Sequence, residues 1–248
     1  MHIKPYERAY KNYKETPKLY YIIDPKTLSL RERIIQEWKT QVVFDAYQIH
    51  APLLVPTEIL NLSGHKKNFS AELMEIKDTG YTLRPQTAQS IFGNLKSLRM
   101  QLKGEPLGIW QVGKAFRIQR STRDGVCRKN EFEQMELQML TNKPIDFFQK
   151  YLPILKKYFE TIGLSPQDLC FKQLGPQDRP HYSHRTIDIM YTLRGRELEI
   201  GCINDRSNHD LHDFSELERT RSKVYQISLG LDRIITILSE ITILKDPL

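Results

Sequence analysis

The sequence predicts an α+β fold in which helices flank an antiparallel sheet. Two segments, 132–140 and 196–203, alternate apolar and polar side chains with a period of two, which is typical of strands that turn one face to a core. Other segments, in the first quarter, the middle and the end of the chain, repeat their apolar residues at helical spacing. Because no repeat, linker or low-complexity stretch interrupts this pattern, a single α+β domain accounts for the chain most simply.

The composition fits one globular domain spanning residues 1–248. Hydrophobic residues make 40% of the chain and charged residues 27%, which excludes disordered and fibrous proteins. The net charge of +7 suits a polyanionic partner such as a nucleic acid or a nucleotide. The three cysteines lack CxxC spacing, and no apolar run reaches the ~18–20 residues of a membrane span. Since the N-terminus is also too polar for a secretory signal, we predict a cytoplasmic protein with no membrane partner.

The chain opens with a lysine- and tyrosine-rich stretch, residues 1–27, which we interpret as an N-terminal arm. Ser29 and Glu32 then form a capping box, which predicts the start of a helix. That helix is expected to run to about Tyr47, with its apolar face toward the core. Two prolines in the segment 50–56 predict an extended stretch after it.

The middle of the chain predicts strands on either side of a charged hairpin loop. The loop holds Asp124 and Gly125, a turn signal, between a strand at 115–120 and a strand at 132–140. The apolar side chains of the second strand share one face: Met135, Leu137 and Met139. Its other side chains share the opposite face, which would line a site: Phe132, Gln134, Glu136 and Gln138.

The remaining elements are a long helix and a strand that leads directly into a last helix. Apolar and aromatic residues predict a helix near 144–162, which Gly163 would end and Pro153 would kink or break. A strand at 223–229 is followed by Gly230 and a helix from there to about Leu244.

Four arginines are the residues of the sequence that point most clearly to a binding site. Arg117 and Arg128 flank the hairpin loop, Arg233 lies in the first turn of the last helix, and Arg84 lies in the segment LRPQTAQS. A guanidinium is permanently charged and bidentate, so two arginines on a hairpin can grip a phosphate from both sides. Phe132, on the same polar face, could stack on a base. Charged hairpins are more often solvated surfaces, so the spacing alone leaves both interpretations open.

Six short sequence blocks favour the interpretation that these arginines form a binding site. They lie in the order NLSGHKKNF (61–69), LRPQTAQSIF (83–92), IWQVGKAFR (109–117), CRKNEF (127–132), INDRSNHDL (203–211) and SLGLDRI (228–234). Together they resemble the catalytic core of glycyl-tRNA synthetase, a class II aminoacyl-tRNA synthetase. The resemblance covers roughly residues 28–244 and implies that family's fold, with an antiparallel sheet flanked by helices. It also implies a homodimer, formed through the segment that matches the family's first motif, from about Ser29 to Pro56.

The resemblance implies ATP and Mg²⁺ as cofactors and a role for each matching residue. Arg117 would hold the α-phosphate of ATP, Arg128 and Arg233 the β- and γ-phosphates, and Phe132 would stack on adenine. Arg206 would pair with the substrate carboxylate, while Glu136 and Glu199 would contact Mg²⁺ or the substrate. The implied catalytic residues are Arg117 and Arg233. The full set implied to bind the substrate acid is Arg84, Gln86, Glu136, Glu199, Arg206, Gln226 and Ser228.

Three positions depart from the family pattern, because glutamate is replaced there by glutamine: Gln86, Gln119 and Gln226. In the family, the residues matching Gln86, Gln226 and Ser228 hold the α-ammonium group of glycine. A glutamine carbonyl accepts a hydrogen bond but cannot neutralise a buried cation. Loss of two carboxylates would weaken recognition of a free amino acid by roughly 10²–10⁴-fold, at ~1.5–3 kcal/mol for each charged hydrogen bond.

The sequence therefore predicts an ATP-dependent, adenylate-forming ligase with altered amino-group recognition. It would activate a small carboxylic or amino acid and pass the acyl group to a tRNA acceptor end or to another acceptor. Only 15 residues follow Arg233, so the anticodon-binding domain usual in the family is expected to be absent. One alternative is a catalytically silent paralogue that acts as a nucleic-acid-binding or accessory subunit. Another is an orthodox glycyl-tRNA synthetase whose anticodon-binding part lies on a separate chain.

Overall fold

The structure is a computed structural model that describes residues 24–119 and 128–245, with side chains described to residue 239. In the first half of the chain the elements are α1 (Pro25–Gln41), β1 (Tyr47–Gln48), β2 (Leu54–Pro56), α2 (Thr57–Leu62), α3 (His65–Phe69), β3 (Met74–Ile76), β4 (Tyr81–Leu83), α4 (Ala88–Phe92), α5 (Leu95–Gln101) and β5 (Leu107–Phe116). In the second half they are β6 (Glu131–Thr141), α6 (Phe147–Ile162), β7 (Leu169–Gln173), β8 (Arg185–Leu193), β9 (Arg196–Ser207), α7 (Glu216–Arg221), β10 (Lys223–Gly230) and α8 (Leu231–Lys245). The predicted hairpin turn at Asp124 and Gly125 lies outside the described residues.

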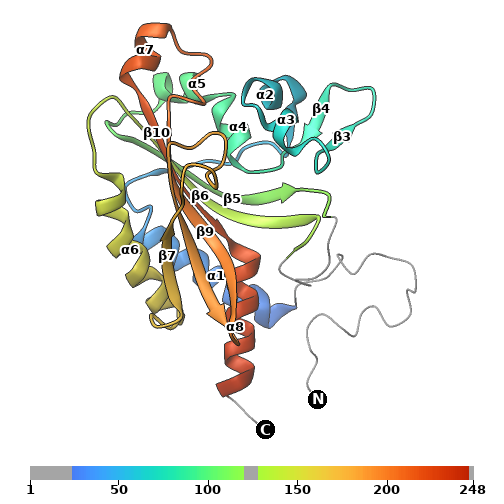
Figure 1. Ribbon diagram of the computed structural model, residues 1–248, viewed down its shortest axis with the longest axis vertical. Coiled ribbons are helices and arrows are strands. Elements are labelled where there is room, and N and C mark those ends of the chain that lie inside the picture. Colours follow the sequence, from blue (N-terminus) through green and yellow to red (C-terminus); the bar gives the residue numbers. More distant parts are fainter. Residues whose placement is uncertain (1–23, 120–127, 246–248) are drawn as a thin grey trace.

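A seven-stranded sheet forms the centre of the fold, in the order β1-β5-β6-β10-β9-β8-β7. The edge strand β1 pairs with β5 in parallel, and every other neighbouring pair is antiparallel. This arrangement confirms the α+β prediction of an antiparallel sheet flanked by helices (Figure 1).

Three long helices cover one face of this sheet. α1, α6 and α8 pack their apolar side chains against the strands in one continuous core, which includes Trp38, Tyr158 and Ile234. The strand residues in that core include Met135, Leu137 and Met139 of β6, so the face predicted from the period-two pattern is confirmed. The neighbouring residues of β6 therefore point to the opposite face of the sheet.

The opposite face carries a smaller layer near one end of the strands. The short helices α4 and α5 pack there on β5 and β10, and a three-stranded sheet in the order β2-β4-β3 lies beside them (Figure 1). No helix among the described residues is long and apolar enough to cross a bilayer.

Helix α6 confirms the predicted helix in the middle of the chain and its stop signal. Gly163 has a φ of 106°, in the left-handed region that favours glycine, and its N–H caps the last turn. The helix is continuous through Pro153, however, so the predicted break is wrong. Packing of the aromatic face against the core compensates for the hydrogen bond that proline cannot donate.

The prediction for α1 is wrong at both ends. The helix begins after Asp24, whose carboxylate accepts a hydrogen bond from the Thr27 amide at 2.9 Å, with Pro25 in the first turn. The hydroxyl of Ser29, the predicted cap, instead donates to the Pro25 carbonyl oxygen inside the helix. The helix ends at Gln41, and Tyr47 begins strand β1 because it pairs with Ile109 of β5. The first three helical residues thus fall inside the arm predicted for 1–27.

Candidate active site

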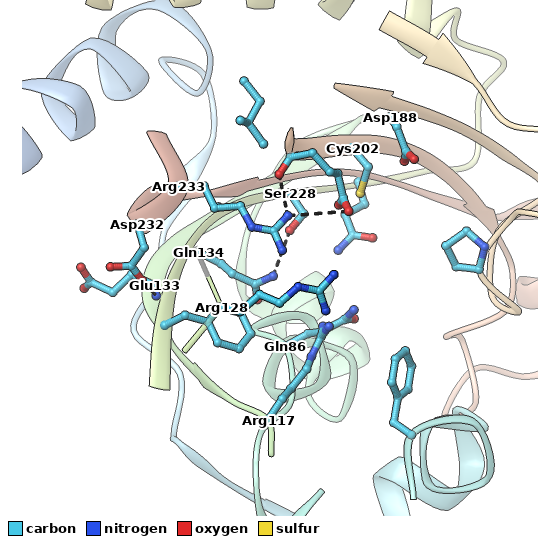
Figure 2. Close-up of a pocket in the computed structure, with 18 of the residues that line it drawn as sticks. Gln86, Arg117, Arg128, Glu133, Gln134, Asp188, Cys202, Ser228, Asp232 and Arg233 are labelled. Atoms are coloured by element: carbon cyan, nitrogen blue, oxygen red, sulfur yellow. Dashed lines mark hydrogen bonds and ion pairs between the residues drawn. The ribbon is translucent and has the colours of Figure 1, made fainter. Parts of the chain in front are cut away.

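A cavity of about 410 Å³ opens on the face of the sheet that the long helices do not cover (Figure 2). Its walls come from β6, β8, β9 and β10, the start of α8, the loop between β7 and β8, and the end of α3. Eight of the residues singled out in the sequence line it: Gln86, Arg117, Arg128, Phe132, Glu199, Gln226, Ser228 and Arg233. Gln119, the third glutamine of the departures, also lines it.

Arg117 lies at one end of the cavity between two aromatic rings. Its guanidinium carbon is 5.3 Å from the ring centre of Phe69 and 5.5 Å from that of Phe132. Its Nε donates to the Pro85 carbonyl oxygen at 2.9 Å, which holds the guanidinium plane in place. Burial lowers the pKa of Arg117, but an arginine stays protonated at neutral pH. The result is a positioned cation beside a ring, which suits a phosphate and a base.

Arg233 and Arg128 bring two more guanidinium groups to the same cavity (Figure 2). Nη1 of Arg233 donates to the Glu199 backbone oxygen at 2.5 Å and lies 3.7 Å from its carboxylate. Both residues are partly exposed, so this ion pair contributes little to stability and can rearrange around a ligand.

A buried and a partly buried ion pair anchor the elements that carry these arginines. Asp232, next to Arg233, accepts hydrogen bonds from Lys129 Nζ at 2.7 Å and from the Glu133 amide at 2.6 Å. Arg31 of α1 in turn grips the Glu133 carboxylate with two hydrogen bonds of 2.6 and 2.7 Å. The start of α8 is thereby fixed to β6, and β6 to α1.

The adjacent wall of the cavity is neutral. Gln86, Gln226 and Ser228 are all at least nine-tenths buried, and each lines the cavity. Ser228 pairs in register with Glu136 on one side and Cys202 on the other, so these side chains point to one face. Burial raises the pKa of the Cys202 thiol, which therefore stays protonated at neutral pH.

Glu136 lies under this wall and not in the lining of the cavity. One carboxylate oxygen accepts from the Thr87 hydroxyl and the other from the amide nitrogen of Gln226. Burial raises the pKa of Glu136, while these two hydrogen bonds and the charges of Arg206 and Arg84 oppose that shift. Glu136 is fully buried, so the predicted direct contact with Mg²⁺ or substrate would require this carboxylate to become exposed to the cavity.

Arg206 is also committed to internal partners. Its guanidinium donates to both carboxylate oxygens of Asp210, at 2.5 and 2.8 Å, and to the side-chain oxygen of Gln226 at 3.0 Å. It is fully buried and does not line the cavity. Its predicted contact with a substrate carboxylate stays a prediction, and its position makes it the support of Gln226.

Arg84 forms a structural clamp beside the cavity. Its guanidinium donates to the backbone oxygens of Ala51, Pro52 and Lys114, at 2.7 to 3.2 Å. Gly113 leaves the room that this guanidinium needs, since a β-carbon at that position would collide with Arg84 Nη2. Arg84 therefore joins the extended segment after α1 to β5, and it does not line the cavity.

A column of stacked groups joins the buried Arg206 to Arg117. Arg206 lies 3.8 Å from the ring centre of Tyr182, which stacks on His65 at 5.4 Å with the planes 10° apart. His65 stacks in turn on Phe69 at 5.6 Å, and Phe69 contacts Arg117. Burial, with the nearby charge of Arg206, lowers the pKa of His65 to about 3, so this ring is neutral at pH 7.

Asp188 and Tyr182 line the cavity and were missed by the sequence reasoning. Asp188 lies on β8, where 186–189 alternates polar and apolar residues, the same kind of signal that predicted the other strands. Burial and the charge of Glu199 raise the pKa of Asp188 to about 6. Tyr182 lies in a loop, where no periodic signal could have marked it.

The cavity fits ATP better than it fits a tightly bound metal ion. Three arginines and an aromatic ring match a polyphosphate and a base. In the part of the chain that the structure describes, no three His, Cys, Asp or Glu side chains gather to hold a metal. Mg²⁺ needs only one or two carboxylates when substrate phosphates supply its other ligands, and Glu199 can supply one.

Comparisons with known proteins identify the family of the chain. The chain matches the family model of the tRNA synthetase class II core domain (G, H, P, S and T) over residues 69–242. It is 31% identical over 224 residues to the glycine–tRNA ligase of Ureaplasma urealyticum serovar 10, which covers 82% of this chain and 47% of that relative. It is 33% identical over 166 residues to the glycine–tRNA ligase of Nocardia farcinica, covering 64% of this chain and 35% of the relative.

A solved structure gives the same fold. The prolyl-tRNA synthetase of Giardia lamblia, in complex with prolyl-adenylate, superposes with a TM-score of 0.68 at 16% identity, covering 85% of this chain and 44% of that chain. The chain spans about half the length, or less, of these relatives.

Proposed function

The chain belongs to the family of class II tRNA synthetase core domains, and from this premise we propose that it is an ATP-dependent ligase that forms an acyl-adenylate. The observation that carries the proposal is the meeting of Arg117, Arg128, Phe132 and Arg233 around one cavity. These residues come from three separate parts of the chain, and a solvated charged hairpin would not bring them together. A catalytically silent paralogue would have no need of this arrangement.

In the proposed reaction, an oxygen of the substrate carboxylate attacks the α-phosphorus of ATP. The bond from this phosphorus to the bridging oxygen of the β-phosphate breaks, and pyrophosphate leaves with that oxygen. Arg117 stabilises the negative charge that develops on the α-phosphate, and Arg128 and Arg233 hold the β- and γ-phosphates. Glu199 would hold Mg²⁺ beside those phosphates, and the bound ion would supply positive charge that offsets theirs. No protein nucleophile is needed, because position and charge supply most of the rate.

The proposal includes altered recognition of the amino group next to the carboxylate. Gln86, Gln226 and Ser228 face the cavity with neutral groups, and the one carboxylate beneath them, Glu136, is already hydrogen-bonded at both oxygens. An α-ammonium group bound there would lose water without gaining an opposite charge. The acid end of the cavity therefore favours a substrate without an ammonium group at the α-carbon, or one that binds with that group elsewhere.

The acyl acceptor and the assembly form the rest of the proposal. A homodimer through α1 and β1, a cytoplasmic location, and transfer to a tRNA acceptor end or to another acceptor are consistent with the family. The +7 net charge supports an anionic acceptor of either kind.

ATP–pyrophosphate exchange with Mg²⁺ tests the proposal, run against glycine, other amino acids and simple carboxylic acids. Exchange with a non-amino acid, or with an acid other than glycine, is the expected result. Exchange with glycine alone would contradict altered recognition and would indicate an orthodox glycine ligase. Absence of both exchange and ATP binding would contradict the ligase proposal and favour the silent paralogue.

A further inference from the structure

We infer that Asp188 binds a cationic amino group at the far end of the substrate acid, several bonds away from the carboxylate that is activated. The inference rests on the proposed function for the position of that carboxylate. It deepens the proposal by naming the substrate class: a small acid with a distal amine and no α-amine, such as an ω-amino acid.

Asp188 ends a row of side chains that crosses the cavity floor. The strand register aligns Glu136 of β6, Ser228 of β10, Cys202 of β9 and Asp188 of β8. Neighbouring strands lie ~4.8 Å apart, so the backbone of Asp188 is about 10 Å from that of Ser228. In Figure 2, Cys202 lies between these two residues, and Arg233 and Asp232 lie on the other side of Ser228. The row therefore leads from the neutral wall away from the arginines.

The backbone of Asp188 pairs with β7 and β9, but its carboxylate has no hydrogen bond or ion pair within residues 24–119 and 128–245. The other half-buried or buried carboxylates of the lining differ: Arg31 holds Glu133, and Lys129 holds Asp232. Glu199 lies beside Arg233, and Asp178 is exposed at the mouth of the cavity. Lys172 is the cross-strand neighbour of Asp188 on the edge strand β7, yet their charged groups make no ion pair within 4 Å. Asp188 is thus a carboxylate in the cavity wall that forms no direct hydrogen bond or ion pair with a described side chain, and Lys172 attracts it only from a distance.

A carboxylate held in this way is costly unless a ligand pairs with it. Burial and the charge of Glu199 disfavour the ionised form of Asp188 more than the charge of Lys172 favours it, so a cationic ligand placed beside this carboxylate would stabilise it. Arg117 and the neutral wall set the near end of the substrate, and Asp188 sets the far end. Cys202 and Ser228 between them are small, which leaves room for an alkyl chain along the row.

Matched pairs of acids that differ only in the distal amine test this inference. The pairs are 4-aminobutyrate with butyrate, and 6-aminohexanoate with hexanoate. Binding is measured by calorimetry with and without Mg²⁺-ATP, and activation by pyrophosphate exchange. The variants are Asp188→Asn and, as a matched control for the loss of one cavity carboxylate, Asp178→Asn.

The wild type is expected to prefer one amine-bearing acid over its partner, with Asp188→Asn reducing that preference about 10- to 100-fold and Asp178→Asn leaving it unchanged. Equal binding within every pair, or a preference that survives in Asp188→Asn, would overturn the inference. A uniform loss of ATP binding in Asp188→Asn would also overturn it, because Asp188 would then act on the nucleotide. Selective binding without any exchange would support Asp188 while contradicting the ligase proposal, so the two failures are distinguishable.

Discussion

The two ends of the cavity use their charges in opposite ways. At the nucleotide end, Arg117 and Arg233 bring their guanidinium groups into the cavity, and the carboxylates behind them are bound by other partners. At the acid end, the charges of Glu136 and Arg206 point into the protein and bind Gln226 from both sides. The same residue types therefore build a charged surface at one end and a rigid neutral surface at the other. The partners of a charged side chain, and not its type, decide which of these it forms.

The largest expected effect comes from restoring charge at the acid end. The double variant Gln86→Glu with Gln226→Glu should raise glycine-dependent pyrophosphate exchange, by up to roughly 10²–10⁴-fold if lost ammonium pairing is the defect. The structure also predicts a loss of stability in this variant, because Gln226→Glu would place a second carboxylate in contact with the carboxylate of Glu136. Without glycine this variant should be less stable, and Gln86→Glu alone should not be. If the double variant showed no gain in exchange, the claim that these two glutamines weaken recognition of the glycine ammonium group would be wrong.

The floor of the acid end should be sensitive to loss of Arg206. Arg206→Met leaves the buried carboxylate of Asp210 without its two charged hydrogen bonds and should cost about 3–5 kcal/mol in unfolding free energy. The matched double variant, Arg206→Met with Asp210→Leu, removes both charges and should recover part of that loss. Urea denaturation measures both. A single variant as stable as the wild type would mean that the pair does not support the floor.

Arg117 should show the opposite behaviour. Arg117→Ala is expected to reduce pyrophosphate exchange by about 10²–10³-fold, as for the loss of one donor to a developing negative charge. Its unfolding free energy should change by only about 1–2 kcal/mol, because among the described residues its side chain makes one hydrogen bond, to the Pro85 carbonyl oxygen, and two cation–π contacts, with Phe69 and Phe132. Arg117→Lys keeps the charge and loses the planar fork, so it should recover only part of the rate. If Arg117→Ala lost as much unfolding free energy as it lost transition-state stabilisation, Arg117 would have a structural role like that of Arg206, and the contrast between these two residues would be wrong.

Tyr182 links the two ends and should have an intermediate effect. Tyr182→Leu removes the ring between Arg206 and His65 and should cost about 1–2 kcal/mol in unfolding free energy. Tyr182→Phe keeps the ring and loses only the 3.5 Å contact of its hydroxyl with Gln86. It should therefore resemble the wild type in thermal denaturation. A large loss in the Phe variant would mean that the hydroxyl, and not the stack, is what matters.

The smallest expected effect is a gain in stability at the far side of the acid end. The pKa of Asp188 is raised from 3.8 to about 6, so the folded protein binds this proton more tightly than the unfolded chain. Its ionisation therefore removes stability as the pH rises from about 4 through 6. Asp188→Asn should match the wild type near pH 4 and be more stable at pH 7.5, by no more than about 1 kcal/mol because the side chain is only half-buried. Lower stability of the variant at pH 7.5 would indicate a structural role.

The sequence predicted the parts of the fold that depend on local periodicity. The apolar face of β6 follows from alternation alone, as do α6 with its stop at Gly163 and the transition from β10 to α8. The predicted start of α1 is wrong because two capping signals lie five residues apart. The helix begins after Asp24, with Pro25 in its first turn, and not after Ser29. No local pattern distinguishes a buried arginine from one in a cavity. Whether Arg206 faces substrate or Asp210 depends on contacts made across the fold.

The most direct test of the contrast between the two ends is the binding of two adenylate mimics. Glycyl-sulfamoyl-adenosine and acetyl-sulfamoyl-adenosine share the nucleotide and differ only in the α-ammonium group. We expect both to bind in competition with ATP, with dissociation constants within about tenfold of each other, because the acid end is neutral. Binding of the glycyl compound 10² times tighter than the acetyl compound or more would contradict a neutral acid end. Failure of both to bind would contradict the nucleotide end as well.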